Sequence, residues 1–486
     1  MIVRCVWVAI ALAACGSVDR GGASSNAVDN PLVASALAKC RTCHGTDGPG
    51  IELRRDSTEA LSGLIHDRVS SGSMPPWQPG PGSVPFVGNY GLTPEERESV
   101  LAWAASGGHL QNELQDPQSA TIPAGAKRVG DLVMPHAYVP PPPPVGDEYR
   151  CFVLPWEGPP VAVVAYRWKL GIEQDPTHRT SVAHHVTGRV VSAIGATEAS
   201  ARQGRDGRPG FPCVAWPPDL EDQADLGASG VGPAMVQAMP PGTGVILPTG
   251  GAVVMQVHYR GAAAAGDVSG VELWEQSREF SAIQQWALWA PVELPCPTGV
   301  SSDPRNRCSR EWAIANSTLQ TPDELRAQEQ YVLGSCGQTV AGKLGTVAFA
   351  KTIPEHWLVP SACEGTFPTN GVLRAVHGHM HTMGASIRVE LRQADGAWST
   401  ILDIPNWRWI WERAYTMQTP IPIQAGQRVR VSCQHDNGSQ AQWGLLSKAP
   451  GMDGRAERPL QDVAYVVMGL EARNEMCEVF FAWTRT

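Results

Sequence analysis

The sequence predicts a mainly β protein in which β-sandwich structure follows a small all-α domain. Its 486 residues include 50 Gly and 41 Pro but only 17% charged residues, which suits short strands and turns better than long helices. From residue 151 onward, apolar or alternating runs such as CFVLPW, VAVVAYRW and SIRVELRQ are separated by Gly and Pro. Helix signals gather instead between residues 30 and 107. The length suits about three domains of roughly 100 to 200 residues each.

The N-terminus predicts an export signal with a lipid attachment site. One early Arg precedes an apolar run, Val6–Ala14, that is too short to span a bilayer. The LAAC that ends at Cys15 resembles the lipobox of bacterial lipoproteins, in which the cysteine is lipidated; ordinary cleavage after a small residue is the alternative. Gly16 in place of Asp then implies the outer membrane. We expect a signal peptide over 1–15, a tether over 16–29, and a lipid-anchored protein of the bacterial cell envelope, facing the periplasm or the exterior.

A haem attachment motif follows the tether. Asn30 is the expected N-cap and Pro31 the first residue of a helix that runs into Cys40-Arg-Thr-Cys43-His44. This is the c-type haem pattern, in which two thiols add to the haem vinyl groups and the histidine binds the iron. A zinc or thioredoxin-like CxxC is the alternative, and the following histidine and the oxidising compartment argue against it. We therefore expect one covalently bound haem c.

The rest of the small domain supplies a sixth iron ligand and a closing helix. SGSMPPW offers Met74 in a loop stiffened by two prolines, and His66 is the rival ligand. LTPEERESVLAWAASGG carries a capping box and resembles the last helix of small cytochromes c. The predicted cytochrome c domain spans 30–112. Five consecutive prolines then enforce polyproline II structure and place a semi-rigid linker over 113–145.

Histidines gather in a few of the expected strands. AVHGHMHTMG places His377, His379 and His381 at alternate positions, so all three leave an extended strand on the same side. Three neutral imidazoles in one place favour a metal, and a polar surface strand is the alternative. VAHHVTG, VMQVHYR and NEMCEVFFAW add four further candidates: His184, His185, His258 and Met476.

In this order, these motifs resemble the copper type II monooxygenases, the family of peptidylglycine α-hydroxylating monooxygenase and dopamine β-monooxygenase. The resemblance begins at DEYRCFVLP, at Asp147, and runs almost to the C-terminus, about two thirds of the chain. It implies two jelly-roll-like β-sandwich domains, for which we expect the ranges 146–277 and 278–486. Each domain would carry one copper ion, and a solvent-filled cleft would separate the two.

The resemblance gives each copper three ligands. Those of the first copper, which stores and passes an electron, are His184, His185 and His258. Those of the second copper, where O2 reacts next to the substrate, are His379, His381 and Met476. A Gly three residues after the His-x-His, here Gly384, selects these two histidines, and His377 is left to line the substrate cleft or to face solvent. Two imidazoles and a thioether suit Cu(I), whereas zinc more often recruits Cys or carboxylate.

The cysteines outside the signal, the lipobox and the haem motif number eight, which permits four disulfides in an exported protein. The resemblance pairs Cys433 with Cys477. A segment that looks like a surface insertion is closed locally by Cys296 and Cys308. The other two pairs follow only by elimination and stay open: Cys336 with Cys363, and Cys151 with Cys213.

The resemblance implies a monooxygenase that inserts one oxygen atom of O2 into a C–H bond of a small organic substrate and reduces the other to water. We expect the fused haem to pass on electrons from a redox donor such as a cytochrome, a quinol chain or ascorbate. His377 and Phe480 stand where the peptide hydroxylase has an Arg and a Tyr that grip the substrate carboxylate, so a glycine-extended peptide is not expected.

Other function classes fit the sequence less well. A non-enzymatic copper-binding or electron-transfer lipoprotein of the same fold is the main alternative. A multicopper oxidase needs several His-x-His pairs and a Cys ligand, and a zinc hydrolase needs a glutamate base beside its histidines. A net charge of −9 without a Lys/Arg run argues against a nucleic-acid partner.

Overall fold

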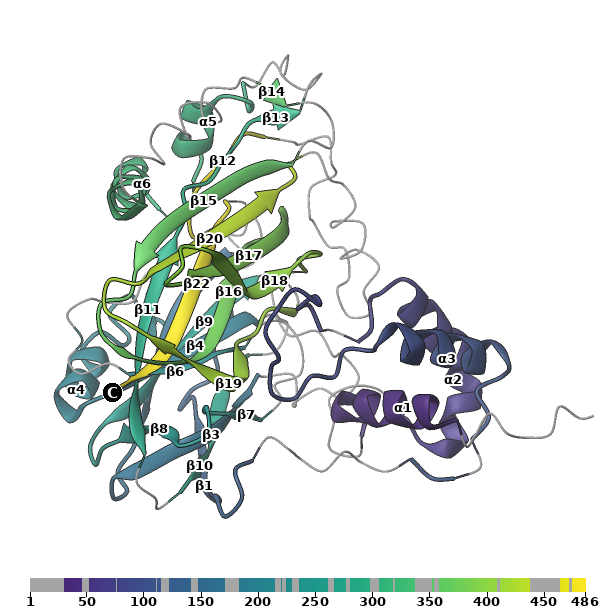
Figure 1. The fold of residues 1–486 in the computed structure, drawn as a ribbon. Coiled ribbons are helices and arrows are strands. Elements are labelled where there is room, and N and C mark those ends of the chain that lie inside the picture. The colour runs from purple at the N-terminus through teal and green to yellow at the C-terminus, as the bar shows by residue number, and fades with distance from the viewer. Residues whose placement is uncertain are drawn as a thin grey trace, which may run out of the picture. The chain divides into compact units, whose positions relative to one another are not determined.

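The structure is a computed structural model that divides the chain into a helical unit and a β unit (Figure 1). The helical unit lies within residues 30–45, 52–75 and 92–114, and the β unit takes the rest, including 77–91. The predicted signal peptide, lipobox and tether lie outside the described residues. The residues that the structure describes are 30–45, 52–75, 77–110, 112–114, 122–140, 147–170, 183–214, 220, 224–229, 236–260, 266–276, 280–297, 306–317, 320–336, 352–353, 358–408, 411–437, 464–471 and 474–486.

Three helices form the helical unit: α1 (Pro31–His44), α2 (Arg55–Ser70) and α3 (Pro94–Ala105). The Asn30 side chain caps α1 by accepting a hydrogen bond from the backbone N–H of Leu32. Thr93 and Glu96 cap α3 as a reciprocal capping box. The apolar faces of the helices enclose a small core that includes Val33, Leu37, Val69, Val100 and Trp103. Among the described residues, no helix is long and apolar enough to cross a membrane.

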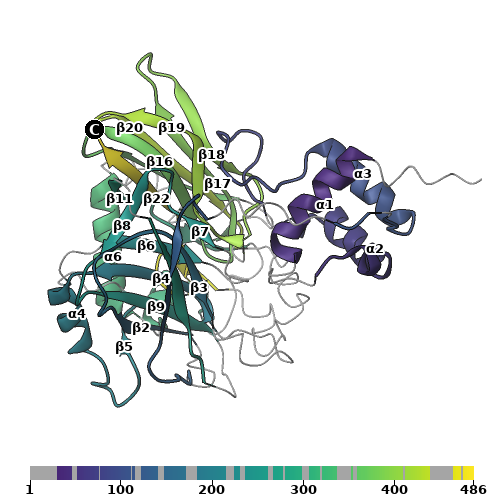
Figure 2. The ribbon, with the colours of Figure 1, turned by 90° about the horizontal axis from the view of Figure 1, so that it is seen from below.

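The first β-sandwich packs two antiparallel sheets around a core of aromatic and branched side chains such as Phe152, Trp168 and Tyr259. One sheet runs in the order β5 (Phe211–Pro212), β2 (Asp147–Pro155), β9 (Ala252–Arg260), β4 (Ala183–Val191) and β6 (Ala224–Ser229). The other runs β1 (Lys127–Val133), β10 (Gly270–Glu275), β3 (Val161–Lys169) and β8 (Thr243–Leu247), with β7 (Gln237–Ala238) paired to β3. Helix α4 (Ala193–Ser200) packs against β2 and β9 from outside (Figure 2).

The second β-sandwich repeats the arrangement with a larger core. One sheet runs β11 (Ser281–Trp289), β22 (Glu478–Arg485), β16 (Gly371–His379) and β19 (Tyr415–Ile423). The other runs β15 (Val359–Thr366), β20 (Arg428–His435), β17 (Gly384–Arg392) and β18 (Trp398–Ile404). A short parallel pairing of β11 with β8 joins one sheet of each sandwich into a single nine-stranded sheet.

Small elements complete the second sandwich. Two-stranded pairs are formed by β12 (Glu293–Leu294) with β21 (Val466–Val467), and by β13 (Cys296–Pro297) with β14 (Thr352–Ile353). Helices α5 (Arg310–Ala315) and α6 (Pro322–Cys336) pack near them. The mainly β, β-sandwich part of the prediction is thus confirmed.

Four disulfides are confirmed, in the pairing that the sequence suggested: Cys151–Cys213, Cys296–Cys308, Cys336–Cys363 and Cys433–Cys477. Cys433 lies on β20 and Cys477 directly precedes β22, so this bridge ties the two sheets of the second sandwich together. Four disulfides in one chain are typical of an oxidising compartment outside the cytosol.

The domain ranges differ from those expected in two places. The expected linker 113–145 contains strand β1, an edge strand that pairs with β10. The strand is mostly exposed and lacks the apolar alternation that predicts strands. Arg128 of β1 forms ion pairs with Asp131 of the same strand and with Glu272 of β10. Residues 77–91 lie inside the expected range 30–112 but pack with the second sandwich. Neither strand pairing nor tertiary packing across such distances leaves a local sequence signal.

Candidate metal centre

Strand β16, in the middle of a sheet of the second sandwich, carries two of the three histidines, His377 and His379. The expectation that all three leave one extended strand is wrong, because β16 ends at His379 and His381 lies in the turn that follows. β16 lies between β22 and β19, and it brings His377 opposite Phe480 and His379 opposite Glu478. All three histidines are largely buried; the exposed fraction is 11% for the His377 side chain, 13% for that of His379 and 8% for His381. The polar-surface alternative for this strand therefore does not hold.

Glu412 joins two of the histidines and was not predicted from the sequence. One carboxylate oxygen, Oε1, lies 2.8 Å from His377 Nε2 and 2.8 Å from His379 Nδ1. Because a carboxylate can only accept, both imidazoles donate, and His379 keeps its Nε2 for another partner. Burial is the largest single influence and opposes a charge on His379, but the charge and hydrogen bond of Glu412, together with Glu478 and Glu475, outweigh it and raise the pKa of His379 to about 9. The signal that could have pointed to Glu412 is that it is the one acidic residue in the aromatic-rich stretch NWRWIWERAY.

His381 is oriented in the same way by the backbone. Its Nδ1 lies 2.8 Å from the carbonyl oxygen of Asn474, which can only accept, so Nε2 of His381 is again the nitrogen left over. Burial and the neighbouring His379 lower the pKa of His381 to about 3, which keeps the ring neutral. The ring centroids of His379 and His381 are 5.1 Å apart with the planes at 84°. Metal-binding histidines are held in this manner, through the ring nitrogen that does not bind.

The backbone of Met476 is linked to that of His381 through a shared carboxylate. Oε2 of the fully buried Glu475 accepts from the backbone N–H of His381 at 3.0 Å and from that of Met476 at 3.1 Å. Its Oε1 accepts from the backbone N–H of Met383. Burial raises the pKa of Glu475 to about 7 although these hydrogen bonds favour the charged form. Glu475 thus connects the turn after β16 to the turn before β22. Met476, on the second of these turns, is 4% exposed.

The predicted first site is described only in part. His258 on β9 is 1% exposed, and its ring stacks on Tyr149 of β2 with centroids 4.0 Å apart. His258 pairs with His185 across β9 and β4, and the register shift between Ala183 and His185 makes His184 the extra residue of a β-bulge. Bulges are frequent next to functional sites. The side chains of His184 and His185 lie outside the described residues, so this ligand set stays a prediction.

One described residue of the predicted first site, His258, is close enough to the predicted second site to act on it electrostatically. His258 acts electrostatically on His381 and further lowers its pKa. Tyr149 bridges the sandwiches, since its hydroxyl donates to the backbone carbonyl of Leu470 at 2.9 Å. The edge of the first sandwich that carries His258 therefore lies on the side of the second sandwich that carries His381.

The haem motif ends α1. Cys40 and Cys43 lie in the last two turns with His44 as the final helical residue, and neither cysteine is in a disulfide. Burial and the nearby Cys43 raise the pKa of the Cys40 thiol to about 11. Met74 follows α2 and donates its backbone N–H to the carbonyl of Arg68, whereas the rival ligand, His66 within α2, has a side chain that is 42% exposed. The choice between Met74 and His66 stays a prediction.

Within the described part of the chain, no group of three or more His, Cys, Asp and Glu side chains is arranged to hold a metal ion. The second predicted site does not need such a group, because its third ligand is a thioether. Two described imidazoles with their Nδ1 atoms engaged, and a buried methionine on the adjoining turn, are a donor set that fits copper.

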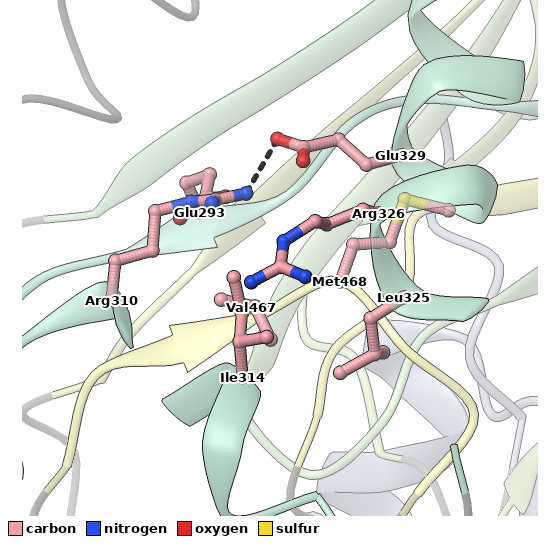
Figure 3. A pocket seen from close by; sticks show the side chains of 8 residues that line it. All are labelled: Glu293, Arg310, Ile314, Leu325, Arg326, Glu329, Val467 and Met468. Carbon is pink, nitrogen blue, oxygen red and sulfur yellow. Dashed lines mark hydrogen bonds and ion pairs between the residues drawn. The ribbon is translucent and has the colours of Figure 1, made fainter. Parts of the chain in front are cut away.

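A charged cluster near α5 and α6 is a structural feature instead (Figure 3). Arg310 of α5 lies 2.7 Å from Glu293 of β12 and 2.7 Å from Glu329 of α6. Burial raises the pKa of Glu293 to about 7 even though Arg310 opposes the shift. The cavity here is about 10 Å³, room for a single water, and none of the predicted ligands lines it. This cluster holds the two helices against the sheet and offers no space for a substrate.

Comparison with known proteins gives little support for any family. No family model matches the chain, and no curated protein matches it. Among solved structures, PNGF-II is similar over 74% of this chain and 66% of its own, at 8% identity and a TM-score of 0.27. Allantoicase is similar over 64% of this chain and 80% of its own, at 10% identity and a TM-score of 0.16. Scores this low carry no argument about fold or function.

Proposed function

We propose that the protein is a copper-dependent monooxygenase that hydroxylates a C–H bond of a small organic substrate with O2, with electrons supplied through a fused c-type haem. The observation that carries the proposal is the pair His379 and His381, each held through Nδ1 with Nε2 left over, beside the buried Met476. Soft thioether and imidazole donors stabilise Cu(I), and copper bound there supplies one-electron chemistry with dioxygen.

The chain's own residues prepare this site. Glu412 and the Asn474 carbonyl fix the orientation of the two imidazoles, and Glu475 fixes the spacing of the two turns that carry them. Their burial excludes bulk water, which would otherwise compete for any exposed reacting group. These residues therefore act by positioning and by excluding solvent.

The same geometry narrows the substrate class. His377 is bound to Glu412 and its ring stacks on Phe480 with centroids 5.5 Å apart. At the two positions where the peptide hydroxylase has an Arg and a Tyr, His377 is therefore engaged by Glu412, and Phe480 has no polar group to grip a carboxylate. Glu412, Glu475 and Glu478 all act electrostatically on His379. A neutral substrate, apolar or phenolic, fits this environment better than a carboxylate.

The helical unit supports the haem part of the proposal. Eight of the ten described cysteines are in disulfides, and the two that are not are Cys40 and Cys43 of the attachment motif. A haem bound there would have His44 as an axial ligand and Met74 or His66 as the other. A tethered donor of single electrons has a high effective concentration at its acceptor. We further propose lipid anchoring at Cys15 in the cell envelope.

The deciding experiment is metal analysis of the purified, copper-loaded protein together with its EPR spectrum. We expect two type 2 coppers per haem iron, and Met476→Ala should lose or weaken one of them. Met134→Ala, which removes a buried methionine from the core of the first sandwich, should keep both. A single copper, none, or zinc in place of either would refute the monooxygenase assignment and favour the non-enzymatic metal-binding lipoprotein.

A separate experiment tests the electron supply. The double variant Cys40→Ala/Cys43→Ala removes covalent haem attachment and leaves the β unit untouched. Turnover driven by a reduced cytochrome or a quinol chain should be lost, while turnover driven by ascorbate should persist. An equal loss with both kinds of donor would count against the haem as the electron carrier.

A further inference from the structure

Residues 77–91, the inserted segment, belong to the β unit although they lie in the chain between α2 and α3. In Figure 1 this dark blue stretch passes beside β18 and β19. Gly80 donates to the carbonyl of Asp403, and Val87 donates to that of Thr416. Phe86, 2% exposed, forms a β-bridge with Met417 and is part of the core of the second sandwich. The segment is therefore built into this sandwich and does not merely rest on its surface.

One side chain of the inserted segment clamps the loop that carries Glu412. Gln78 is 8% exposed; its Nε2 donates to the carbonyl of Trp411 at 2.9 Å, and its Oε1 accepts from the backbone N–H of Arg408 at 2.5 Å. A single buried amide thus holds the backbone on both sides of residues 409–410. Trp411 directly precedes Glu412, so the clamp acts one residue from the carboxylate that binds His379.

The residues after Glu412 are held by the same segment. Arg413 donates to the hydroxyl of Tyr90, and its guanidinium lies over the rings of Trp77 and Tyr90. The ring of Trp77 meets that of Tyr415 edge-on, with centroids 5.4 Å apart. The two backbone neighbours of Glu412 are consequently both in contact with the inserted segment.

We propose that the inserted segment is a structural part of the second metal site, in which Gln78 positions Glu412 and Glu412 in turn orients His379. The proposal rests on the proposed function in one respect, namely that a metal binds at His379. Gln78 is a positioning residue, since it touches neither the ligands nor the substrate position. The site is thereby completed by chain that leaves the helical unit after Met74 and returns to it before α3.

The test compares Gln78→Ala with Gln418→Ala in the full-length protein. Gln418 is the matched control, because its side chain also bonds the inserted segment, donating to the carbonyl of Phe86 at 2.9 Å, but on β19 and away from Glu412. Three quantities are measured at a pH above the pKa of His379, where its ring is neutral: amide exchange at Arg408, the tautomer of His379 from ¹⁵N-histidine spectra of the metal-free protein, and the affinity of the second copper by chelator competition with EPR.

Gln78→Ala should speed exchange at Arg408, lower the fraction of His379 protonated at Nδ1, and weaken the second copper by up to about tenfold, the lower end of the range for losing the direct partner of a metal-binding histidine, because Glu412 itself is still present. The first copper should be unaffected, and Gln418→Ala should match the wild type. Gln78→Glu keeps the acceptor for Arg408 but turns a second acceptor toward the carbonyl of Trp411, so it should also weaken the second copper and shift the tautomer. The same outcome from two different substitutions guards against misfolding of either one.

Faster exchange at Arg408 with an unchanged tautomer and unchanged copper affinity would overturn the proposal. A wild-type protein without a second copper would overturn the proposed function instead. In that case a tautomer shift in Gln78→Ala would still support the link from the inserted segment to His379, so the two failures are distinguishable.

Discussion

Replacing Glu412 tests the orientation of the second metal site most directly. The Oε1 atom of Glu412 accepts from His377 and from His379, each at 2.8 Å, in a buried setting. Glu412→Ala leaves both donors without this acceptor and frees the ring of His379 to rotate or to change tautomer. Glu412→Gln keeps a carbonyl oxygen that can accept both hydrogen bonds and removes only the negative charge.

The size of the effect follows from the kind of contact that is lost. Removing the outer partner of a metal-binding histidine lowers metal affinity by roughly 10- to 100-fold, or about 1.4 to 2.7 kcal/mol. Glu412→Ala should fall in that range. Glu412→Gln should lie between the wild type and the alanine variant, because hydrogen bonds to a charged acceptor are about twice as strong as neutral ones.

The assay is a competition titration of copper against a chelator, with the EPR signal of each site followed separately. It is run at a pH above the pKa of His379, so that a proton on the wild-type ring does not compete with copper. Glu293→Ala is the control, since Glu293 is also a buried glutamate but pairs with Arg310 near α5 and contacts no predicted ligand. Wild-type affinity in Glu412→Ala, or equal losses in the alanine and glutamine variants, would refute the role assigned to this carboxylate.

Three further predictions concern stability, each measured by urea denaturation. A hydrogen bond from the buried Arg150 holds the pKa of Asp206 below its usual range. The ionised Asp206 therefore stabilises the folded protein fully above about pH 4, and this contribution to the free energy of unfolding is lost as the pH falls further. Asp206→Asn should therefore cost about 2 kcal/mol at pH 7, less than a buried pair usually loses because backbone carbonyls still bind Arg150. The cost should begin to fall only below about pH 4 and be clearly smaller at about pH 2; equal losses at pH 7 and pH 2 would contradict this. Gly188→Ala should cost about 1 to 3 kcal/mol, because a Cβ there overlaps the ring of Trp168; wild-type stability would show that the core can adjust. Cys433→Ala opens a loop of 44 residues beside the metal-site methionine and should cost about 4 kcal/mol; a loss below 1 kcal/mol would show that the bridge constrains little.

The features that the sequence predicted are those set by local chemistry. The caps at Asn30 and Thr93 lie within three residues of the groups they bind, and the strand that carries His377 and His379 is defined by its own alternation. Glu412 could not be found in this way. It lies 33 residues from His379 and reaches it only because β19 pairs beside β16. The inserted segment was missed for the same reason, since Gln78 meets Trp411 across 333 residues.

The inserted segment limits where the chain can be divided in order to exchange one domain for another. A haem module joined by a plain linker could be exchanged for another electron donor as a cassette. Here, cutting out the range 30–112 would also remove Phe86 from the core of the second sandwich and Gln78 from its loop. A functional chimera would have to keep this stretch with the β unit, so replacement at the sequence boundary should yield a misfolded second sandwich and not merely a protein without its electron donor.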